Sequence, residues 1–541
     1  MQEHSETVFT NGRVWSTDGL PATTAMVCGG RITAVGGDDV RRQAGAAAQE
    51  VDLAGGLLLP GFIDAHVHPV QGGLERRACD LTGCGSAAEC LETIGAYAAS
   101  HPDVHWVLGG GWQISHFPNG APSADQLDAV VGDRPAFLLN ADHHGAWVNS
   151  RALQLAGINA AVPDPVDGRI ERDATGLPLG TLHEGAMHLL DEVLPAATED
   201  DQLEALLEAQ TFLHSLGITG WQDAIIGTYA NMADASAAYV RAAAEQRLTA
   251  RVVGALWWDR TRGAEQVPEL VERRARLAGE RFRASYVKIM QDGIAENFTA
   301  GMTTPYLDAC GHSTDNRGMS FVDPVALAEH VSELDRLGFG VHVHAIGDRA
   351  VREALDAFAA ARRRNGPTGN RHHIAHIQVV HPDDVPRFAQ LDVTANMQPL
   401  WAAHEPEMDE FVIPFLGPER AGWQYPFAAL QASGARLAGG SDWPVSSPDP
   451  LHGIHVAVNR ISPRGDAPPF LAEQRLDLTS ALRAYTAGSA YVNGDDDAGR
   501  IAVGARADLA VVDRDLFALP VEEIASARVV QTYVGGQLVH G

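Results

Sequence analysis

The sequence contains one lysine, Lys288, although lysine and arginine together number 40 in a chain of 541 residues. Every other basic side chain is arginine, so the basic positions of this chain do not in general require lysine. An arginine guanidinium stays charged, whereas an amine can lose its proton and react. We therefore expect Lys288 to have a chemical role, with the chance survival of a single lysine as the alternative.

Positive charge is also scarce, because 69 acidic residues give the chain a formal net charge of −29. Nucleic acids and anionic membranes are bound through basic patches, so this charge argues against both partners. No run of about 18 apolar residues is present. The N-terminal segment MQEHSETVF also lacks the basic and apolar regions of a signal peptide. We expect no membrane partner.

Cysteine is sparse, and its five positions do not form a recognisable metal motif: Cys28, Cys79, Cys84, Cys90 and Cys310. Their number is odd and no CxxC occurs, so neither a disulfide framework nor a zinc ribbon is predicted. Reduced thiols of this kind are typical of a cytoplasmic protein, which is the location we expect.

Short strands with tight turns occupy both ends of the chain. TAMVCGGRITAVGG lies near the N-terminus and ARVVQTYVGGQLVHG at the C-terminus, and each is broken by a Gly-Gly turn. The chain is too long for one hydrophobic core. We predict a small composite β-sandwich domain built from residues 1–60 and 486–541.

The middle of the chain, residues 61–485, alternates short apolar runs with helical stretches, which predicts a parallel sheet wrapped by helices. Eight candidate strands close an α/β fold of the (β/α)₈ TIM-barrel type. A segment of about 150 residues separates the first two strands, far more than a usual loop. We therefore predict a large insertion, at about residues 100–195, near the active-site mouth. The eight strands lie in GLLLPGFIDAHVH, ITGWQDAI, ARVVGALWW, YVKIMQDG, GVHVHAIGD, HHIAHIQVV, DVTANMQP and ARLAGGSDWPV.

Ionisable residues interrupt five of these strands near the end where barrel enzymes carry their chemistry. In the first strand, His66 and His68 are two residues apart, so both point to one side and can grip one ion. Asp64 shares that face and can position one of the pair. A lone HxH motif is a weak signal for metal.

Lys288 lies in the middle of the fourth strand, in YVKIMQDG. Burial would lower the pKa of its amine toward neutrality. A neutral amine can take up carbon dioxide and become a carbamate, which is an anionic ligand able to bridge two metal ions. This carboxylation is a hypothesis that follows from the position of the only lysine.

The remaining candidates are His344 in the fifth strand, His376 in the sixth and Asp442 at the end of the eighth. Each histidine taken alone is better explained as a satisfied core residue. Asp442 can touch a metal and accept a proton from bound water. The ordered set HxH, Lys, His, His, Asp on five strand ends favours a divalent metal site, which lowers the pKa of bound water toward 7.

These motifs resemble those of the amidohydrolase superfamily, and more narrowly amidohydrolase family 3, the branch similar to N-substituted formamide deformylase. The resemblance covers nearly the whole chain and includes LPGFIDAHVHP, VKIMQDG, HAIGDRAV, RHHIAHIQVV, GSDWPV and DHHGAWVNSRAL. It implies two metal ions, usually Zn²⁺, bridged by carboxylated Lys288. The implied ligands are His66, His68 and Asp442 for one ion and His344 and His376 for the other.

The resemblance further implies an enzyme that hydrolyses carbon–nitrogen bonds other than peptide bonds, in an amide, formamide or related small molecule. A metal-bound hydroxide would attack the carbonyl carbon, and Asp442 would carry the proton to the leaving nitrogen. A deaminase with one metal is an alternative, but such enzymes typically lack the lysine of the fourth strand. A non-catalytic scaffold is a further alternative, which the complete ligand set disfavours.

Substrate contacts are harder to infer from the sequence. Trp112 and His144 in the insertion, and Asn297 and His312 after the fourth strand, are candidates for the pocket wall. Trp112 is equally well explained as core packing. Barrels of this family often dimerise, so a homodimer is one expected assembly, and neither the substrate nor the oligomeric state follows from the sequence.

Overall fold

A barrel of eight parallel strands forms the centre of the computed structural model, which describes residues 6–16, 21–229, 232–463 and 465–541. The first five residues, which begin the segment without signal-peptide features, lie outside the described part. The strands pair in the order β20-β19-β18-β17-β16-β15-β14-β7, and all seven ladders are parallel. Their bounds are Phe62–Val67 (β7), Ile218–Ile226 (β14), Arg251–Trp257 (β15), Phe282–Met290 (β16), Gly340–Ala345 (β17), His373–His376 (β18), Thr394–Met397 (β19) and Leu437–Gly439 (β20). The predicted (β/α)₈ fold is confirmed.

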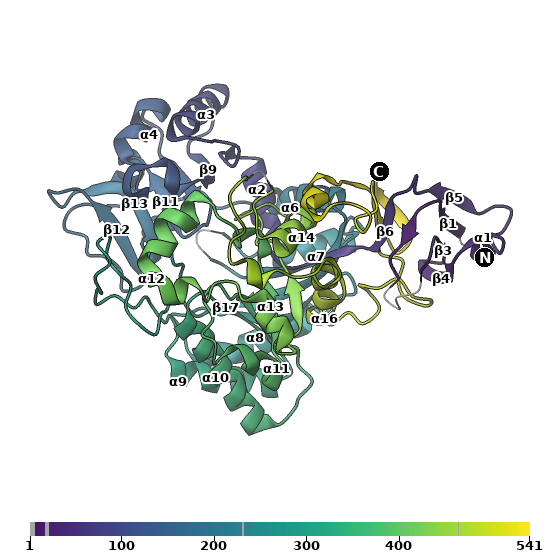
Figure 1. Cartoon of the computed structure of the whole chain (residues 1–541). Helices are drawn as coiled ribbons and strands as arrows, with labels where there is room; N and C mark the ends of the chain where they lie inside the picture. The colour runs from purple at the N-terminus through teal and green to yellow at the C-terminus, as the bar shows by residue number, and fades with distance from the viewer. Residues whose placement is uncertain (1–5, 17–20, 230–231, 464) are drawn as a thin grey trace.

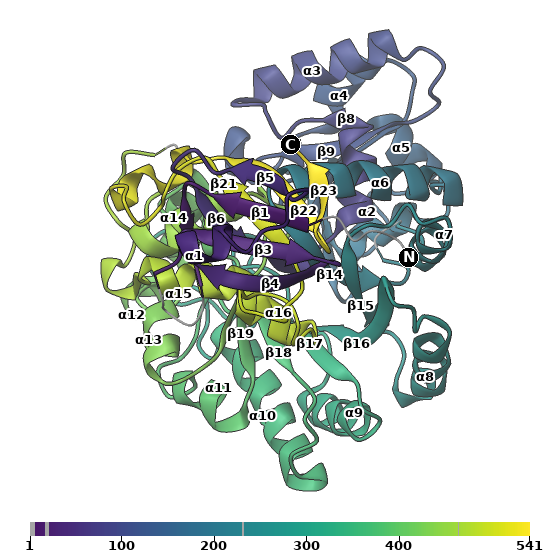
Figure 2. The ribbon, with the colours of Figure 1, turned by 90° about the vertical axis from the view of Figure 1, so that its right-hand side faces the viewer.

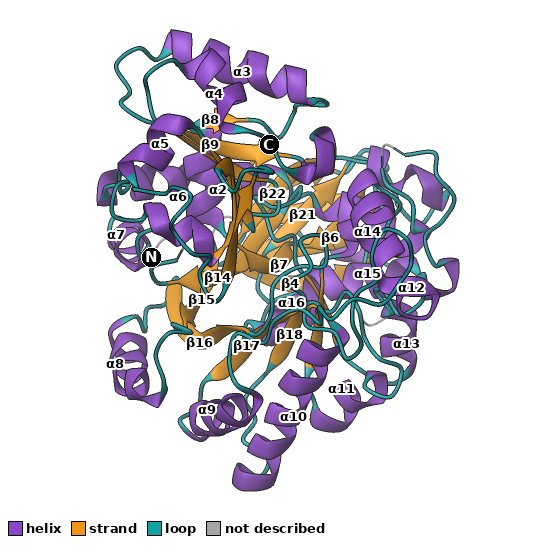
Figure 3. Cartoon of the chain, turned by 90° about the vertical axis from the view of Figure 1, so that its left-hand side faces the viewer, coloured by secondary structure: helices purple, strands orange, loops and turns teal. Residues whose placement is uncertain are grey.

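Helices cover the outside of this sheet, as Figure 3 shows for α8 to α11. Helix α10 illustrates why, because Val351, Leu355 and Phe358 recur at helical spacing and are buried, whereas three arginines end the helix in solvent. The helices around the barrel are Pro69–Arg76 (α2), Glu199–Ser215 (α6), Ser236–Ala244 (α7), Val267–Arg276 (α8), Pro324–Arg336 (α9), Asp348–Asn365 (α10), Val385–Leu391 (α11), Ile413–Ala421 (α12), Phe427–Ala432 (α13) and Pro450–Asn459 (α14).

Between β7 and β14 the chain forms a second, six-stranded sheet with the order β12-β13-β11-β10-β9-β8. Helices α3 (Ala87–Ser100), α4 (Ala124–Val131) and α5 (Ser150–Leu155) accompany it, and Figure 1 shows this insertion at the upper left of the barrel. Its strands are Cys79–Asp80 (β8), Val107–Trp112 (β9), Ala136–Asn140 (β10), Gly145–Val148 (β11), Gly168–Arg172 (β12) and Pro178–Glu184 (β13).

The two ends of the chain come together in a pair of small sheets, β4-β3-β1-β5 and β2-β6-β21-β22-β23. Figure 2 shows the purple N-terminal and yellow C-terminal strands side by side. Phe9, Leu58 and Tyr533 belong to one apolar core between them. The strands are Glu6–Thr10 (β1), Arg13–Val14 (β2), Thr24–Cys28 (β3), Arg31–Gly36 (β4), Gln49–Asp52 (β5), Leu57–Pro60 (β6), Leu509–Val512 (β21), Val529–Val534 (β22) and Gln537–His540 (β23).

No helix in the described part of the chain has the length and apolar character needed to cross a membrane.

The barrel closes where the segment after β20 meets the end of β7. The backbone N–H of Asp442 donates to the carbonyl of His66 over 2.7 Å, and the N–H of His68 donates to the carbonyl of Trp443 over 2.8 Å. Gly440 makes this approach possible, because a Cβ there would lie 2.8 Å from Cβ of His66 and 2.9 Å from its backbone nitrogen. The junction therefore requires glycine at position 440.

Replacing Gly440 with alanine should force this junction apart and lower the free energy of unfolding by about 1–3 kcal/mol, the usual range for overpacking. Urea unfolding followed by circular dichroism measures the effect. Gly83→Ala is the control, since a Cβ at Gly83 meets nothing within 4 Å. Equal stability of the two variants would contradict the importance of this contact.

Candidate metal centre

Six polar side chains from five barrel strands meet at the C-terminal end of the barrel. All six line one cavity of about 610 Å³. His68 lies one residue beyond β7, because Pro69 begins helix α2 at the position where proline suits a helix start. The six residues are His66 (β7), His68, Lys288 (β16), His344 (β17), His376 (β18) and Asp442, three residues beyond β20.

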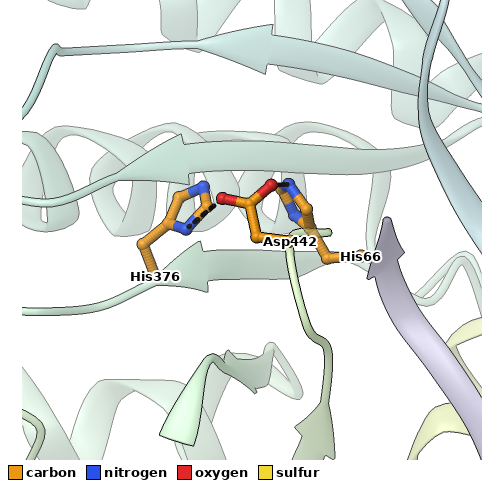
Figure 4. Close-up of side chains that lie close together, drawn as sticks. All are labelled: His66, His376 and Asp442. Atoms are coloured by element: carbon orange, nitrogen blue, oxygen red, sulfur yellow. Dashed lines mark ion pairs between the residues drawn. The ribbon is translucent and has the colours of Figure 1, made fainter. Parts of the chain in front are cut away.

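Asp442 lies at the centre of this group. Its Oδ1 is 2.9 Å from Nε2 of His68 and 3.1 Å from Nε2 of His66, and its Oδ2 is 3.8 Å from Nδ1 of His376. Figure 4 shows the rings of His66 and His376 on either side of the carboxylate. One potential ligand atom from each of these three residues lies within 4.8 Å of the others, so all three face the same small volume.

Lys288 and His344 extend the cluster on the side of β16 and β17. Nζ of Lys288 is 3.5 Å from Nε2 of His66. The ring of His344 packs 4.4 Å from the ring of His376, centroid to centroid, and its Nε2 lies 3.3 Å from the carbonyl oxygen of Gly293. The structure therefore brings all six predicted ligands into one neighbourhood.

The electrostatics of the cluster favour the protonation states that metal ligands require. Burial lowers the pKa of Lys288 to about 7, against an opposing effect of the Asp442 carboxylate. Burial also lowers the pKa of His66 to about 3, so its ring is neutral. Burial raises the pKa of Asp442, but the adjacent rings of His66 and His68 lower it more strongly, so Asp442 stays ionised.

The polar atoms that lack a partner also fit a cation in this position. Both ring nitrogens of His376, and Nδ1 of His68, are buried without a hydrogen-bond partner among the described residues. Leaving a buried polar atom unsatisfied costs about 1–3 kcal/mol. Lone pairs of neutral imidazoles beside a carboxylate are the donor set that zinc and similar divalent ions prefer.

A second polar pair lies at the cavity wall, where His144 of the insertion meets Glu184. Nδ1 of His144 is 2.8 Å from Oε1 of Glu184, and the same oxygen accepts from Asn297 (3.2 Å) and Thr299 (2.9 Å). Burial lowers the pKa of His144, but the Glu184 carboxylate raises it by a larger amount, and the resulting pKa is about 9. Burial raises the pKa of Glu184, but His144 lowers it more strongly, to about 2. The pair is ionised near neutral pH.

Of the four predicted substrate contacts, two line the cavity and two do not. His144 and Trp112 line the cavity, although Trp112 is fully buried and its indole N–H donates to the carbonyl of Leu138. The side-chain N–H of Asn297 donates a hydrogen bond to Glu184. The side chain of His312 is 78% exposed and pairs with Asp308 on the surface, so the structure does not bring it to the cavity.

Sequence reasoning missed Glu184 as well as several buried amides beneath the cluster. Glu184 ends strand β13 in the sequence TLHE, and Gln222 lies within the apolar strand β14. A polar residue inside a buried strand was the available signal in both cases. Their partners come from distant parts of the chain, among them His144 for Glu184 and His342 for Gln222, so the sequence alone does not reveal the pairing.

The mouth of this eight-stranded parallel barrel gathers imidazoles, a carboxylate and a buried amine, a donor set that suits a divalent metal ion. The chain belongs to the amidohydrolase family, whose model matches residues 49–540. It is 31% identical to protein LONG AFTER FAR-RED 3 of Arabidopsis thaliana, over 99% of this chain and 92% of that protein. It is 28% identical to N-substituted formamide deformylase of Arthrobacter pascens, over 96% and 94%.

A solved structure supports the same assignment. An uncharacterised metal-dependent hydrolase from Pyrococcus furiosus superposes with a TM-score of 0.70 at 26% identity, covering 94% of this chain and 99% of that one. The expected membership of the amidohydrolase group is confirmed.

The ion pair of His144 and Glu184 should make stability depend on pH in a defined window. Because the folded-state pKa of His144 is raised from 6.5 to about 9, its contribution is complete below pH 6.5 and is lost as the pH rises through 9. The gap in melting temperature between the unmodified protein and His144→Gln should therefore be largest near pH 6 and shrink toward pH 9.5.

Thermal unfolding at a series of pH values measures this gap. His188→Gln is the control, because it removes a more exposed histidine that pairs with Asp191 over 2.9 Å. A gap for His144→Gln that stays constant from pH 6 to pH 9.5 would show that the ring is not held in its charged form.

Proposed function

We propose that the protein hydrolyses a carbon–nitrogen bond, other than a peptide bond, in a small amide, formamide or related molecule. The observation that carries this proposal is the position of Lys288, whose side chain is buried with its Nζ 3.5 Å from Nε2 of His66. Burial of an amine is costly, and the Asp442 carboxylate offsets only part of that cost. Conversion of the amine to an anionic metal ligand would remove the buried positive charge.

The conversion requires only carbon dioxide. The lone pair of Nζ of Lys288 forms a bond to the carbon of carbon dioxide, the nitrogen releases one proton, and the product is a carbamate anion. The lowered pKa of Lys288 favours this step, because only the neutral amine has the lone pair. Carboxylated Lys288 would then be an anionic residue that helps to hold two divalent ions.

The remaining residues divide into two sets by their position. His66, His68 and Asp442 would hold one ion, since both rings contact the same carboxylate oxygen. His344 and His376, whose rings pack together, would hold the other. Zinc is the ion that we favour for this mixture of nitrogen and oxygen ligands.

When bound, the metal pair would polarise the substrate carbonyl and lower the pKa of water. The protein residues would transfer the proton and bind the substrate. Asp442 is ionised and reaches the centre of the cluster, so it can accept the proton of the attacking water and return it to the leaving nitrogen. His144, charged and 5.9 Å from the ring of His344, lies where it can donate to a substrate oxygen.

The family and its named members support this choice of reaction. The name of the Arthrobacter pascens relative, N-substituted formamide deformylase, indicates that this relative cleaves the carbon–nitrogen bond of a formamide. All six positions of the proposed metal site are occupied by competent ligands, which disfavours a non-catalytic scaffold. Lys288 in β16 disfavours a deaminase that uses one metal ion.

Replacing Asp442 with asparagine should reduce kcat by about 10²–10⁴-fold, the usual contribution of a general acid–base group. The assay is hydrolysis of a panel of N-formyl amines, N-acyl amino acids, cyclic ureides and carbamates, with zinc or manganese supplied. Asp308→Asn, at the surface, is the control. Normal turnover by a folded Asp442→Asn protein would remove the proposed proton carrier.

Replacing Lys288 with arginine should remove the bridge and lower the bound metal from two ions per chain to about one, because a guanidinium cannot form a carbamate. Metal analysis by mass spectrometry after gel filtration measures the content. A variant that retains two ions per chain would show that Lys288 is not a ligand.

A further inference from the structure

A continuous chain of side-chain hydrogen bonds runs beneath the metal centre, and none of its inner members is a proposed metal ligand. It begins at the backbone of His376 and ends at the ring of His66. Every member is at most 2% exposed, so water does not interrupt it. The members, in order, are Gln398, Asn396, His373, Gln222, His342 and His66.

The direction of this chain is fixed at one end by a backbone donor. The N–H of His376 can only donate, so the atom of Gln398 that meets it at 2.8 Å is the oxygen Oε1. The other amide atom of Gln398 is therefore Nε2, which donates to Oδ1 of Asn396 over 3.1 Å.

A backbone acceptor fixes the same direction independently. The carbonyl oxygen of Ala65 can only accept, so the atom of Asn396 that meets it at 2.9 Å is the nitrogen Nδ2. This orientation leaves Oδ1 of Asn396 to accept from Gln398, which is what the first anchor also requires. Two backbone groups from two different strands thus agree on the orientation of both amides.

The order of protons follows from Asn396 onward. Its Nδ2 also meets Nδ1 of His373 at 3.1 Å, so that ring nitrogen accepts and the ring proton is on Nε2. Nε2 of His373 donates to Oε1 of Gln222 over 2.9 Å. Gln222 therefore presents its oxygen to this side, and its nitrogen donates to Asn493 over 3.2 Å.

The same oxygen of Gln222 sets the next two rings. It lies 2.8 Å from Nδ1 of His342, which must donate, so Nε2 of His342 carries no proton. That bare nitrogen lies 2.9 Å from Nδ1 of His66 and accepts its proton. His66 is thereby left with an unprotonated Nε2, the nitrogen that faces Asp442 and Lys288.

This result explains a contact that is otherwise unfavourable. Nε2 of His66 and Oδ1 of Asp442 are 3.1 Å apart, yet the chain makes both atoms acceptors. Two acceptors at that separation need a cation between them. Two ligands of one tetrahedral zinc ion are expected roughly 3.3 Å apart, from metal–ligand distances of about 2.0–2.1 Å.

We infer that Gln222 and His342 are positioning residues for the metal centre, which hold the proton of His66 on Nδ1 and so present Nε2 to the ion. This inference rests on the proposed function only for the presence of metal. A reversed amide at Gln222 would invert the order, place a proton on Nε2 of His66 and block the ligand position. The orientation of the Gln222 amide therefore decides which ring nitrogen of His66 faces the ion.

The proton order is measurable without substrate, on metal-free protein labelled with ¹⁵N in histidine. Two-bond ¹H–¹⁵N correlation spectra distinguish protonated from bare ring nitrogens, and His66→Asn identifies the signals of His66. We expect a protonated Nδ1 and a bare Nε2 for His66, and the same pattern for His342. A proton on Nε2 of His66 in the otherwise unchanged protein would overturn the inference without any test of a variant.

Metal affinity gives the second readout. Gln222→Leu removes the acceptor at similar size and should raise the Kd for zinc by about 10–100-fold, the usual cost of losing a group that orients a metal ligand. Gln222→Glu, which keeps an acceptor oxygen, should recover most of the affinity. Gln210→Leu is the matched control, because Gln210 is a buried glutamine of α6 bonded to Arg247 and Thr249, remote from the cluster.

Zinc binding by Gln222→Leu as tight as by Gln210→Leu would also overturn the inference. The test is separable from that of the proposed function. A protein that shows the expected His66 tautomer and binds zinc, but hydrolyses none of the amide panel, would contradict the proposed reaction and leave the positioning role intact.

Discussion

The junction between the segment after β20 and the end of β7 is the contact on which both the barrel and the polar cluster depend. The backbone of Asp442 bonds the backbone of His66, while its carboxylate meets the rings of His66 and His68. Asp64 adds to the junction by accepting from the N–H groups of His66 and Ser441. A buried carboxylate is tolerated only when its partners are in place. The contacts that close the barrel are therefore the same contacts that assemble the polar cluster.

The barrel was predictable because its strands bury both faces and so form apolar runs of the right length. All eight predicted strands are present, although the boundaries shift by a few residues, as where β7 ends before His68. Against this apolar background a histidine, a lysine or an aspartate stands out, which is why the six candidate ligands could be named. Their role as ligands remains a prediction that the geometry supports.

The amides beneath the cluster could not be predicted in the same way. Gln222, Asn396 and Gln398 are ordinary polar residues in the sequence, and their meaning depends on which strands are neighbours and in what register. His144 lies just before β11 and Glu184 ends β13, with no periodic pattern that joins them. His312 was predicted to line the pocket but lies on the surface. A position after a barrel strand does not establish that a loop side chain turns toward the barrel mouth.

The solitary amine has a consequence for the chemistry of the whole molecular surface. Because arginine occupies every other basic position, the exterior offers amine-directed reagents no lysine side chain at all. The one ε-amino group is enclosed at the barrel mouth and only 3% exposed. Covalent labelling of a lysine side chain by acylating agents or aldehydes would therefore report directly on access to the cavity at the barrel mouth.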